Sequence, residues 1–383
     1  MADVTALREF SLDGIYEGNA RGVRFSRLNA KLDETTLKGS LGVEDFAGPA
    51  LAFSLSADTL NLDRYLAPPA APAATSKPKA RGPVVAPELA LLAAAKLPVE
   101  TLRQLKVTAD AKLDLLLMGG LKLERVEVAL NGSEGLLRLD PLNAEGYQGR
   151  YSGIATLDAR GAVPQLSLNA NLAKVSLEPL LMDLNGRREL AGSMNFEARL
   201  SAAGATSTAL RESVAGQATF AVQNGVLRGL DVPSLLRGAE QLITGKTKTL
   251  PTLSGKTPFK ALTGTLEIRD GAVFNRDLRL DGAGFRLTGE GMLYDLKSQR
   301  LKYGARLARD PDTAEDGGFR LKQLGNIALP LRCEGPLAVG SCAPDVKALL
   351  KQIPKKTLRK VEGAVEKLLD GKAGRDLKKL LKQ

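Results

Sequence analysis

The chain has 383 residues, of which 44% are hydrophobic and only 4% aromatic, and it contains no His and no Trp. Without His there is no Ser-His-Asp or Cys-His arrangement and no imidazole metal site, and two Cys alone cannot form a zinc site. The net charge of +11 is concentrated in residues 344–383, which carry 12 Lys and Arg against 5 Asp and Glu, so nucleic-acid binding by the rest of the chain is disfavoured.

Residues 1–66 predict a run of β-strands. Leu51, Phe53, Leu55 and Ala57 alternate with polar neighbours, which is typical of a strand with one buried face. Residues 67–96 are rich in Pro and Ala and have no period, which predicts a linker or a long exposed loop with room for a short helix at 88–96.

Strand patterns return over residues 97–343, and one helix interrupts them. Asp231 is placed to cap this helix, Pro233 sits in its first turn, and apolar residues recur at helical spacing from Val232 to Ile243. The chain then predicts successive β-hairpins, with turns at Asp270-Gly271 and at Asp281-Gly282, because Gly accepts the positive φ of a tight hairpin turn.

An internal repeat is the most informative feature. Residues 39–66 match residues 153–181, and the matching apolar positions pair Leu51, Phe53, Leu60, Leu62 and Leu66 with Leu166, Leu168, Val175, Leu177 and Leu181. Repeated strand-turn-strand units predict a mainly β protein, built as an elongated, curled antiparallel repeat sheet with a few short helices.

An apolar stripe follows from the same alternation. Its candidate members are Leu166, Leu168, Leu266, Ile268, Leu278, Leu280, Phe285, Leu287, Leu301 and Tyr303. Periodicity alone favours the interior of a sandwich or closed barrel. The alternative is an open groove that holds a lipid, since soluble proteins rarely leave large apolar patches exposed.

Cys333 and Cys342 lie nine positions apart across a short loop. They are either two buried thiols or, as the spacing favours, a disulfide, which would indicate an oxidising compartment such as the periplasm.

The tail, residues 344–383, predicts amphipathic helices. They either pack on the end of the sheet or bind an anionic membrane or an acidic partner. The candidate docking residues are Lys355, Lys356, Arg359 and Lys360.

Three stretches resemble the AsmA family of Gram-negative envelope proteins: GQATFAVQNGVLRGLDVPSLLR (216–237), LTGTLEIRDGAVFNRDLRLDGAGFRLTGEGMLYD (262–295) and LPLRCEGPLAVGSCAPD (329–345). The resemblance covers roughly residues 97–345 and, more loosely, 3–66. It implies a β-groove protein of the periplasm that is anchored in the inner membrane and associated with phospholipid movement toward the outer membrane. The chain shows no signal peptide or membrane span, which indicates a cytosolic protein or a fragment that lacks its targeting segment.

The leading hypothesis is therefore a non-enzymatic lipid-transfer protein with an apolar groove, serving outer-membrane lipid homeostasis. Its expected partners are phospholipids, the inner membrane through an anchor absent from this chain, and other envelope proteins. No nucleic acid, cofactor, metal or catalytic residue is expected. The alternative is a structural or assembly factor for outer-membrane proteins, acting through exposed strand edges.

Overall fold

The computed structural model describes residues 6–48, 50–65, 97–243, 255–295, 298–310, 328–336 and 341–352. The fold class predicted from sequence is confirmed, because seventeen strands belong to one open hydrogen-bonded sheet accompanied by a few short helices. The linker expected at 67–96 and the tail residues from 353 onward lie outside the described residues.

The described residues form two compact units. Unit 1 comprises the residues up to Arg187, with Met194–Thr219 and Glu267–Gly271. Unit 2 comprises Arg188–Ser193, Phe220–Leu266 and the residues from Ala272 onward.

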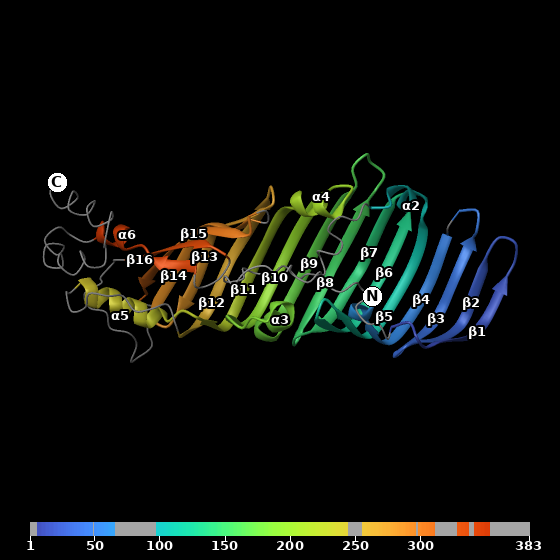
Figure 1. Cartoon of the computed structure of the whole chain (residues 1–383), viewed down its shortest axis with the longest axis horizontal. Coiled ribbons are helices and arrows are strands. Elements are labelled where there is room, and N and C mark those ends of the chain that lie inside the picture. Colours follow the sequence, from blue (N-terminus) through green and yellow to red (C-terminus); the bar gives the residue numbers. More distant parts are fainter. Residues whose placement is uncertain are drawn as a thin grey trace, which may run out of the picture. The chain divides into compact units, whose positions relative to one another are not determined.

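Unit 1 is built on strands that lie side by side in chain order (Figure 1). The strands are β1 (Phe10–Gly18), β2 (Val23–Leu32), β3 (Thr35–Asp45), β4 (Ala50–Asn61), β5 (Lys106–Met118), β6 (Leu121–Ser133), β7 (Leu136–Gly146), β8 (Gly149–Asp158) and β9 (Gln165–Ser176). Consecutive strands pair antiparallel, except that β4 and β5 are parallel. The chain between Asn61 and Lys106 is long enough for the crossover that a parallel pair requires.

Short helices accompany these strands. They are η1 (Leu62–Arg64), α2 (Val99–Gln104), α3 (Leu177–Asn185) and α4 (Ser207–Glu212). Strand β10 (Leu190–Ala203) precedes α4 along the chain, and strand β11 (Ala215–Arg228) follows it. The two copies of the sequence repeat take equivalent places, since Leu62 opens η1 directly after β4 and Leu177 opens α3 directly after β9.

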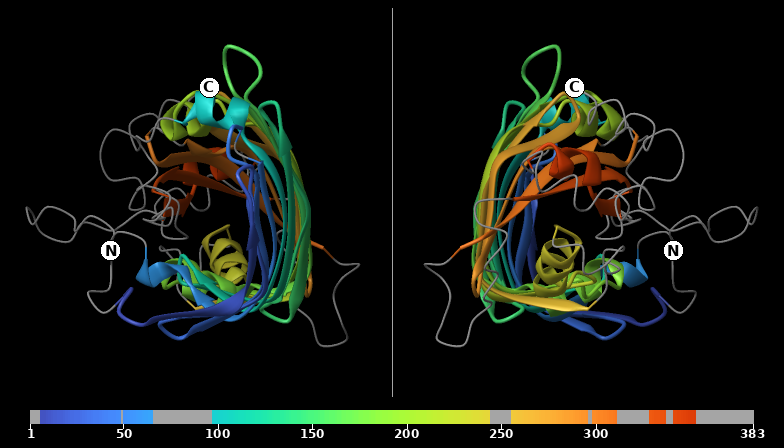
Figure 2. Two further views of the ribbon diagram at one scale, coloured as in Figure 1. Left: turned by 90° about the vertical axis from the view of Figure 1, so that its right-hand side faces the viewer. Right: turned by 90° about the vertical axis from the view of Figure 1, so that its left-hand side faces the viewer.

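The strands of unit 1 are bent, as Figure 2 shows for its blue and green strands. Register shifts mark the bends: between β2 and β3 the pairing passes from Phe25–Leu41 to Leu28–Gly39. Gly39 has φ +143°, and a Cβ there would lie 1.9 Å from the carbonyl oxygen of Ser54. Only glycine fits this position, so the sequence itself specifies where the strand bends.

Asp33, in the turn between β2 and β3, fastens the residues before β1 to the sheet. Its carboxylate accepts hydrogen bonds from the backbone N–H groups of Leu7, Arg8 and Glu9 and from the hydroxyl of Tyr65. These bonds, led by that of Leu7, lower the pKa of Asp33 to about 2.

Unit 2 continues with antiparallel strands after β12 (Lys256–Arg269). They are β13 (Ala272–Gly282), β14 (Phe285–Asp295), β15 (Arg300–Arg309), β16 (Leu329–Gly335) and β17 (Cys342–Pro344). The hairpin predicted at Asp270-Gly271 is confirmed, with φ of +52° and +73° at the two residues. The turn predicted at Asp281-Gly282 is wrong by two residues, because Gly282 still pairs with Phe285 in the ladder.

The second turn therefore lies at Ala283-Gly284, where Gly284 has φ +77°. Asp281 is a strand residue whose carboxylate accepts hydrogen bonds from Arg279 and Arg286, both at 2.7 Å. Burial works against ionisation of Asp281, but the two guanidinium groups prevail and lower its pKa.

Two helices belong to unit 2. The helix predicted after Asp231 is confirmed as α5 (Val232–Ile243), and the Asp231 carboxylate accepts a hydrogen bond from the Ser234 N–H at 2.9 Å. The second helix, α6 (Val346–Leu350), is capped in the same way by Asp345 and contacts β16. Figure 2 shows α5 on the side toward which the strands of this unit curve.

Candidate apolar binding face

One face of unit 1 is apolar along rows of directly paired residues. The first row crosses nine strands, from β1 to β9, and consists of Tyr16, Phe25, Leu41, Phe53, Ala109, Leu130, Leu139, Ala155 and Leu168. A second row runs beside it through Val23, Val43, Leu51, Val107, Gly132, Leu137, Leu157 and Leu166. We call these two rows the apolar face. It contains two of the predicted lining residues, Leu166 and Leu168.

The opposite face of the same strands is polar, because successive side chains of a strand point to opposite sides. The row between the two apolar rows holds Arg24, Gly42, Ala52, Thr108, Asn131, Arg138, Thr156 and Ser167. Ion pairs such as Arg24–Glu44 at 3.3 Å and Lys112–Glu127 at 3.4 Å join exposed side chains on the strands and add little stability. The sheet of unit 1 is thus amphipathic, and its apolar face carries no ionisable group except the phenol of Tyr16.

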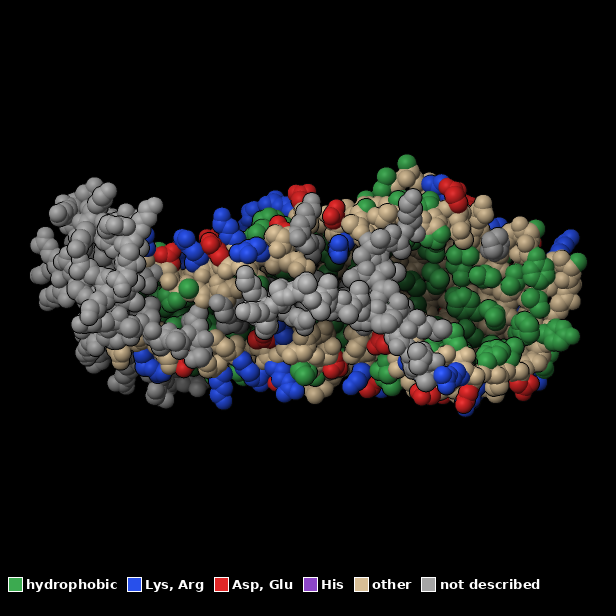
Figure 3. Space-filling view, in the orientation of Figure 1, with side chains coloured by type: hydrophobic (Ala, Val, Ile, Leu, Met, Phe, Trp, Pro, Cys, Tyr) green, Lys and Arg blue, Asp and Glu red, His purple; other side chains and the backbone are tan. Residues whose placement is uncertain are grey.

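The apolar face is open over its first strands. Tyr16 is 73% exposed and Leu41 is 40% exposed, and Phe10 and Leu12 of β1 are also largely exposed. Figure 3 shows hydrophobic side chains gathered in a hollow over β1 to β5. Contiguous exposed apolar patches are uncommon on soluble proteins and are typical of surfaces that bind apolar partners.

Farther along unit 1, apolar residues pack together. Leu116, Val126 and Ala144 are buried, and partly buried side chains including Tyr151 pack against them. Burial raises the pKa of Tyr151 to about 12, so its hydroxyl stays neutral and adds no charge to this region.

A nearby tyrosine ties α3 to the sheet. The Tyr147 hydroxyl donates to Asp183 at 2.9 Å and accepts from the Lys122 N–H at 3.1 Å. Burial and this contact with Asp183 raise the pKa of Tyr147 to about 12.

The predicted lining residues of unit 2 lie in a packed interior. Leu280, Phe285, Leu287, Leu301 and Tyr303 are each less than 8% exposed. Leu280 and Leu287 belong to a fully apolar row that ends in Leu307 and Leu329, both with no exposed surface. In this structure these side chains contact other protein groups, so their part in lining a groove stays a prediction.

The remaining three predicted lining residues, Leu266, Ile268 and Leu278, are only partly buried. Leu278 packs against the buried cluster that contains Leu301, Tyr303 and Cys333. Leu278 therefore keeps some exposed surface next to this packed interior.

A buried polar network stiffens the same part of unit 2. The Tyr303 hydroxyl donates to the Asn275 side-chain oxygen, and the Asn275 amide donates to the Thr265 carbonyl at 2.9 Å and to Asp277 at 2.8 Å. Burial raises the pKa of Tyr303. The hydrogen bonds of this network join β12, β13 and β15 and help to fix their geometry.

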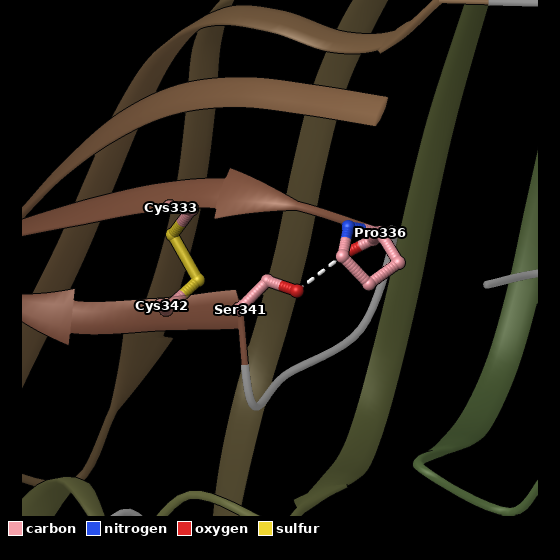
Figure 4. Close-up of a disulfide and its surroundings, with 4 residues drawn as sticks. All are labelled: Cys333, Pro336, Ser341 and Cys342. Carbon is pink, nitrogen blue, oxygen red and sulfur yellow. Dashed lines mark hydrogen bonds between the residues drawn. A yellow bond between two sulfur atoms is a disulfide. The ribbon is translucent and has the colours of Figure 1, made fainter. Parts of the chain in front are cut away.

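The disulfide predicted between Cys333 and Cys342 is confirmed (Figure 4). The two residues are directly paired in β16 and β17, and the Ser341 hydroxyl donates to the Pro336 carbonyl beside them. The predicted docking residues Lys355, Lys356, Arg359 and Lys360 lie outside the described residues. None of the helices in the described part of the chain is both long enough and apolar enough to cross a membrane.

Sequence reasoning left several members of the apolar face out of the predicted lining, among them the exposed Tyr16 and Leu41 and the partly exposed Phe25 and Phe53. The sequence repeat could have identified Phe53, because it aligns Phe53 with Leu168, which is one of the predicted lining residues. In the structure Phe53 and Leu168 indeed lie in the same row.

Comparison with known proteins gives a family match and one relative. The model of the AsmA family matches residues 1–278. The chain is 26% identical over 274 residues to Protein AsmA of Escherichia coli (strain K12). The aligned region covers 69% of this chain and 43% of that protein. The chain thus spans less than half the length of this relative. No solved structure matches the chain.

Proposed function

Because the chain belongs to the AsmA family, we propose that it is a non-enzymatic lipid-binding protein of the Gram-negative envelope. In this proposal the apolar face of unit 1 shields phospholipid acyl chains as they pass between the inner and outer membranes. The observation that carries the proposal is a row of apolar side chains across nine strands that remains open at Tyr16 and Leu41.

The energetics favour this use of the face. An acyl chain of sixteen carbons in water costs on the order of 10 kcal/mol, at about 0.8 kcal/mol for each CH₂ group. An apolar surface in contact with the chain removes most of that cost without any chemical step. The face is mainly aliphatic, so it offers no single strong contact point at which a chain would stop.

The cellular setting is part of the proposal. Family membership and the Cys333–Cys342 disulfide are both consistent with an envelope protein in the periplasm, where disulfides persist. Association with the inner membrane is part of the same proposal. Phospholipids are the proposed partners, and further envelope proteins could hold the protein in position.

A second candidate function is assembly of outer-membrane proteins through a strand edge. Strand β1 favours it, because all nine of its residues are exposed, and an incoming strand could add to such an edge.

Photo-crosslinking in living cells separates the two candidates. A benzophenone amino acid replaces Phe53 on the apolar face, and a matched variant carries it at Ser56, which is exposed on the polar face of the same strand. Phospholipid adducts at position 53 and none at position 56 support lipid binding. Adducts of position 53 with proteins alone, or equal lipid labelling at both positions, would overturn it.

A further inference from the structure

Strand β1 forms an open edge of unit 1 in the part of the chain that the structure describes. It pairs with β2 along its whole length, from Phe10–Leu32 to Gly18–Val23, and all nine of its residues are exposed. Figure 1 shows β1 as the outermost strand at the blue end of the sheet. The backbone N–H and C=O groups along its outer edge are therefore accessible to another strand.

The described residues before β1 do not follow this edge. The backbone N–H groups of Leu7, Arg8 and Glu9 donate to the carboxylate of Asp33, and the Asp33 N–H donates to the Glu9 carbonyl at 2.8 Å. The hydroxyl of Tyr65, which follows β4 and η1, donates to the same carboxylate. These bonds hold the chain at the β2–β3 turn, at one end of β1, and leave the outer edge of β1 open.

The side chains of β1 lack the devices that protect a strand edge. Protected edges usually carry Lys, Pro or a charge that points inward, whereas β1 (FSLDGIYEG) contains no Lys, Arg or Pro. The register shift in the β1–β2 pair adds its extra residue to β2, so side chains alternate regularly along β1. Phe10, Leu12 and Tyr16 therefore share the apolar side, each at least half exposed, and Asp13 and Glu17 point to the other side.

The open edge fits a protein strand better than a membrane. Unpaired backbone groups are too costly in hydrocarbon for an open sheet edge to enter it. A partner must therefore supply backbone hydrogen bonds, and it must also cover apolar side chains on one side of β1. An antiparallel strand with alternating apolar residues meets both needs.

A second copy of β1 is such a strand. When two copies pair antiparallel about Gly14, all nine residues of each strand find a partner, and Leu12 lies opposite Tyr16 of the second copy. Asp13 lies opposite Ile15 of the second copy in this register. The neighbouring registers that keep the apolar sides together are worse. Centring on Asp13 sets this carboxylate against itself, and centring on Ile15 sets Asp13 against Glu17.

We propose that β1 is the interface of a homodimer in which two copies of the strand pair antiparallel about Gly14. The two-fold axis is perpendicular to the sheet, so the apolar faces of both copies lie on the same side, and the row that ends at Tyr16 continues into Leu12 of the second copy. Joining nine strands to nine strands lengthens the apolar face from about 43 Å to about 86 Å. The interface depends on the strand alone and does not require that the face binds lipid.

The first test measures the mass of the purified full chain by light scattering over a range of concentrations. We expect twice the 40.6 kDa of one chain at high concentration. Ile15→Asp sets a new carboxylate against Asp13 of the second copy, twice in each dimer, and should raise the dissociation constant about tenfold or more. The control Ser56→Asp adds the same charge to the polar face of β4 and should leave the dimer unchanged.

A charge exchange tests the register. In Asp13→Lys/Ile15→Asp the new lysine of each copy lies opposite the new aspartate of the other, so the attraction should restore the dimer that Ile15→Asp weakens. The restoration is specific, because it requires that positions 13 and 15 lie opposite each other.

Cross-linking at Gly14 tests the same geometry without adding charge. Directly paired residues have Cα atoms about 4.5–5.5 Å apart, which is within the range of a disulfide. A Cβ at Gly14 would have no neighbour closer than 3.4 Å, and Cys333 and Cys342 are already bonded to each other. Mild oxidation of Gly14→Cys should give a covalent dimer, and Ser56→Cys should give none.

Each contrary outcome is decisive. A chain that stays monomeric at every concentration and forms no covalent dimer through Gly14→Cys overturns the proposal, including the case in which β1 pairs with a strand of another protein. A dimer that survives Ile15→Asp, or that the charge exchange does not restore, also overturns it. Circular dichroism identifies a variant that fails to fold, and cross-linking through Gly14→Cys then decides. No lipid enters these measurements, so their failure leaves the lipid-binding function standing.

Discussion

Replacing Leu41 by Asp puts a charge in the centre of the open part of the apolar face. Leu41 is directly paired with Phe25 on one side and with Phe53 on the other. Its side chain is 40% exposed, so the new carboxylate can remain hydrated when no lipid is bound. We expect the substitution to cost about 1 kcal/mol of folding free energy, as is usual for a half-exposed position.

With lipid bound, the same substitution is far more costly. The acyl chain loses contact with a leucine, which is worth about 2 kcal/mol, and it would cover a carboxylate that has no partner. A combined loss of about 3 kcal/mol lowers lipid occupancy at this place on the order of 100-fold, because each 1.4 kcal/mol is a factor of about ten. Folding is nearly spared while local binding is lost, and this contrast is what the experiment measures.

The assay is lipid labelling from a benzophenone amino acid at Phe53, next to the substituted position. The matched control is Ser56→Asp, which adds the same charge on the opposite face between the paired residues Lys38 and Lys112. Labelling should fall strongly in Leu41→Asp and stay at the original level in Ser56→Asp. Equal labelling in the two variants would show that lipid does not lie on this face.

Three further predictions concern stability. Gly39→Ala should lower the free energy of unfolding in urea by about 2 kcal/mol or more, because the φ of +143° and the nearby backbone admit no Cβ. Gly48→Ala, with open space around it, should leave this free energy unchanged, and equal losses in the two variants would refute the role of Gly39 in the bend. Removing the disulfide with Cys333→Ala/Cys342→Ala should cost roughly 2–3 kcal/mol, seen as a lower thermal midpoint that reductant no longer changes. The lowered pKa of Asp33, about 2, contributes stability that is fully present above pH 4 and is lost as the pH falls toward 2; Asp33→Asn should remove this part of the acid dependence, and an unchanged profile would contradict it.

The sequence predicted the architecture well where local chemistry decides it. The Asp270-Gly271 hairpin and the capped helix after Asp231 both follow from rules that act within a few residues. The turn near Asp281 was misplaced because an Asp-Gly pair also suits a strand end when cross-strand arginines hold the carboxylate. That partner choice depends on pairing, which a single strand does not reveal.

The candidate site was predictable only in part. Alternation shows which side chains share a face, and it correctly placed Leu166 and Leu168 on the same face. It could not show that Leu280 lies in a packed interior while Leu41 is open, because coverage depends on elements distant in the chain. For this reason the lining predicted for unit 2 and the face found in unit 1 carry the same sequence pattern.

The parallel pairing of β4 and β5 was also beyond the sequence. Its strands read like all the others, and the interval from Asn61 to Lys106 permits a crossover without requiring one. Nevertheless the parallel register keeps Phe53 opposite Ala109, so the apolar row continues across the change of direction.

Native mass spectrometry of the protein purified from cells without detergent tests the central claim most directly. The lipid-binding function predicts that the protein carries phospholipid, that the bound mass is confirmed by lipid extraction, and that Leu41→Asp carries less than Ser56→Asp. A folded protein that carries no lipid from cells, and takes up none from vesicles, would contradict it.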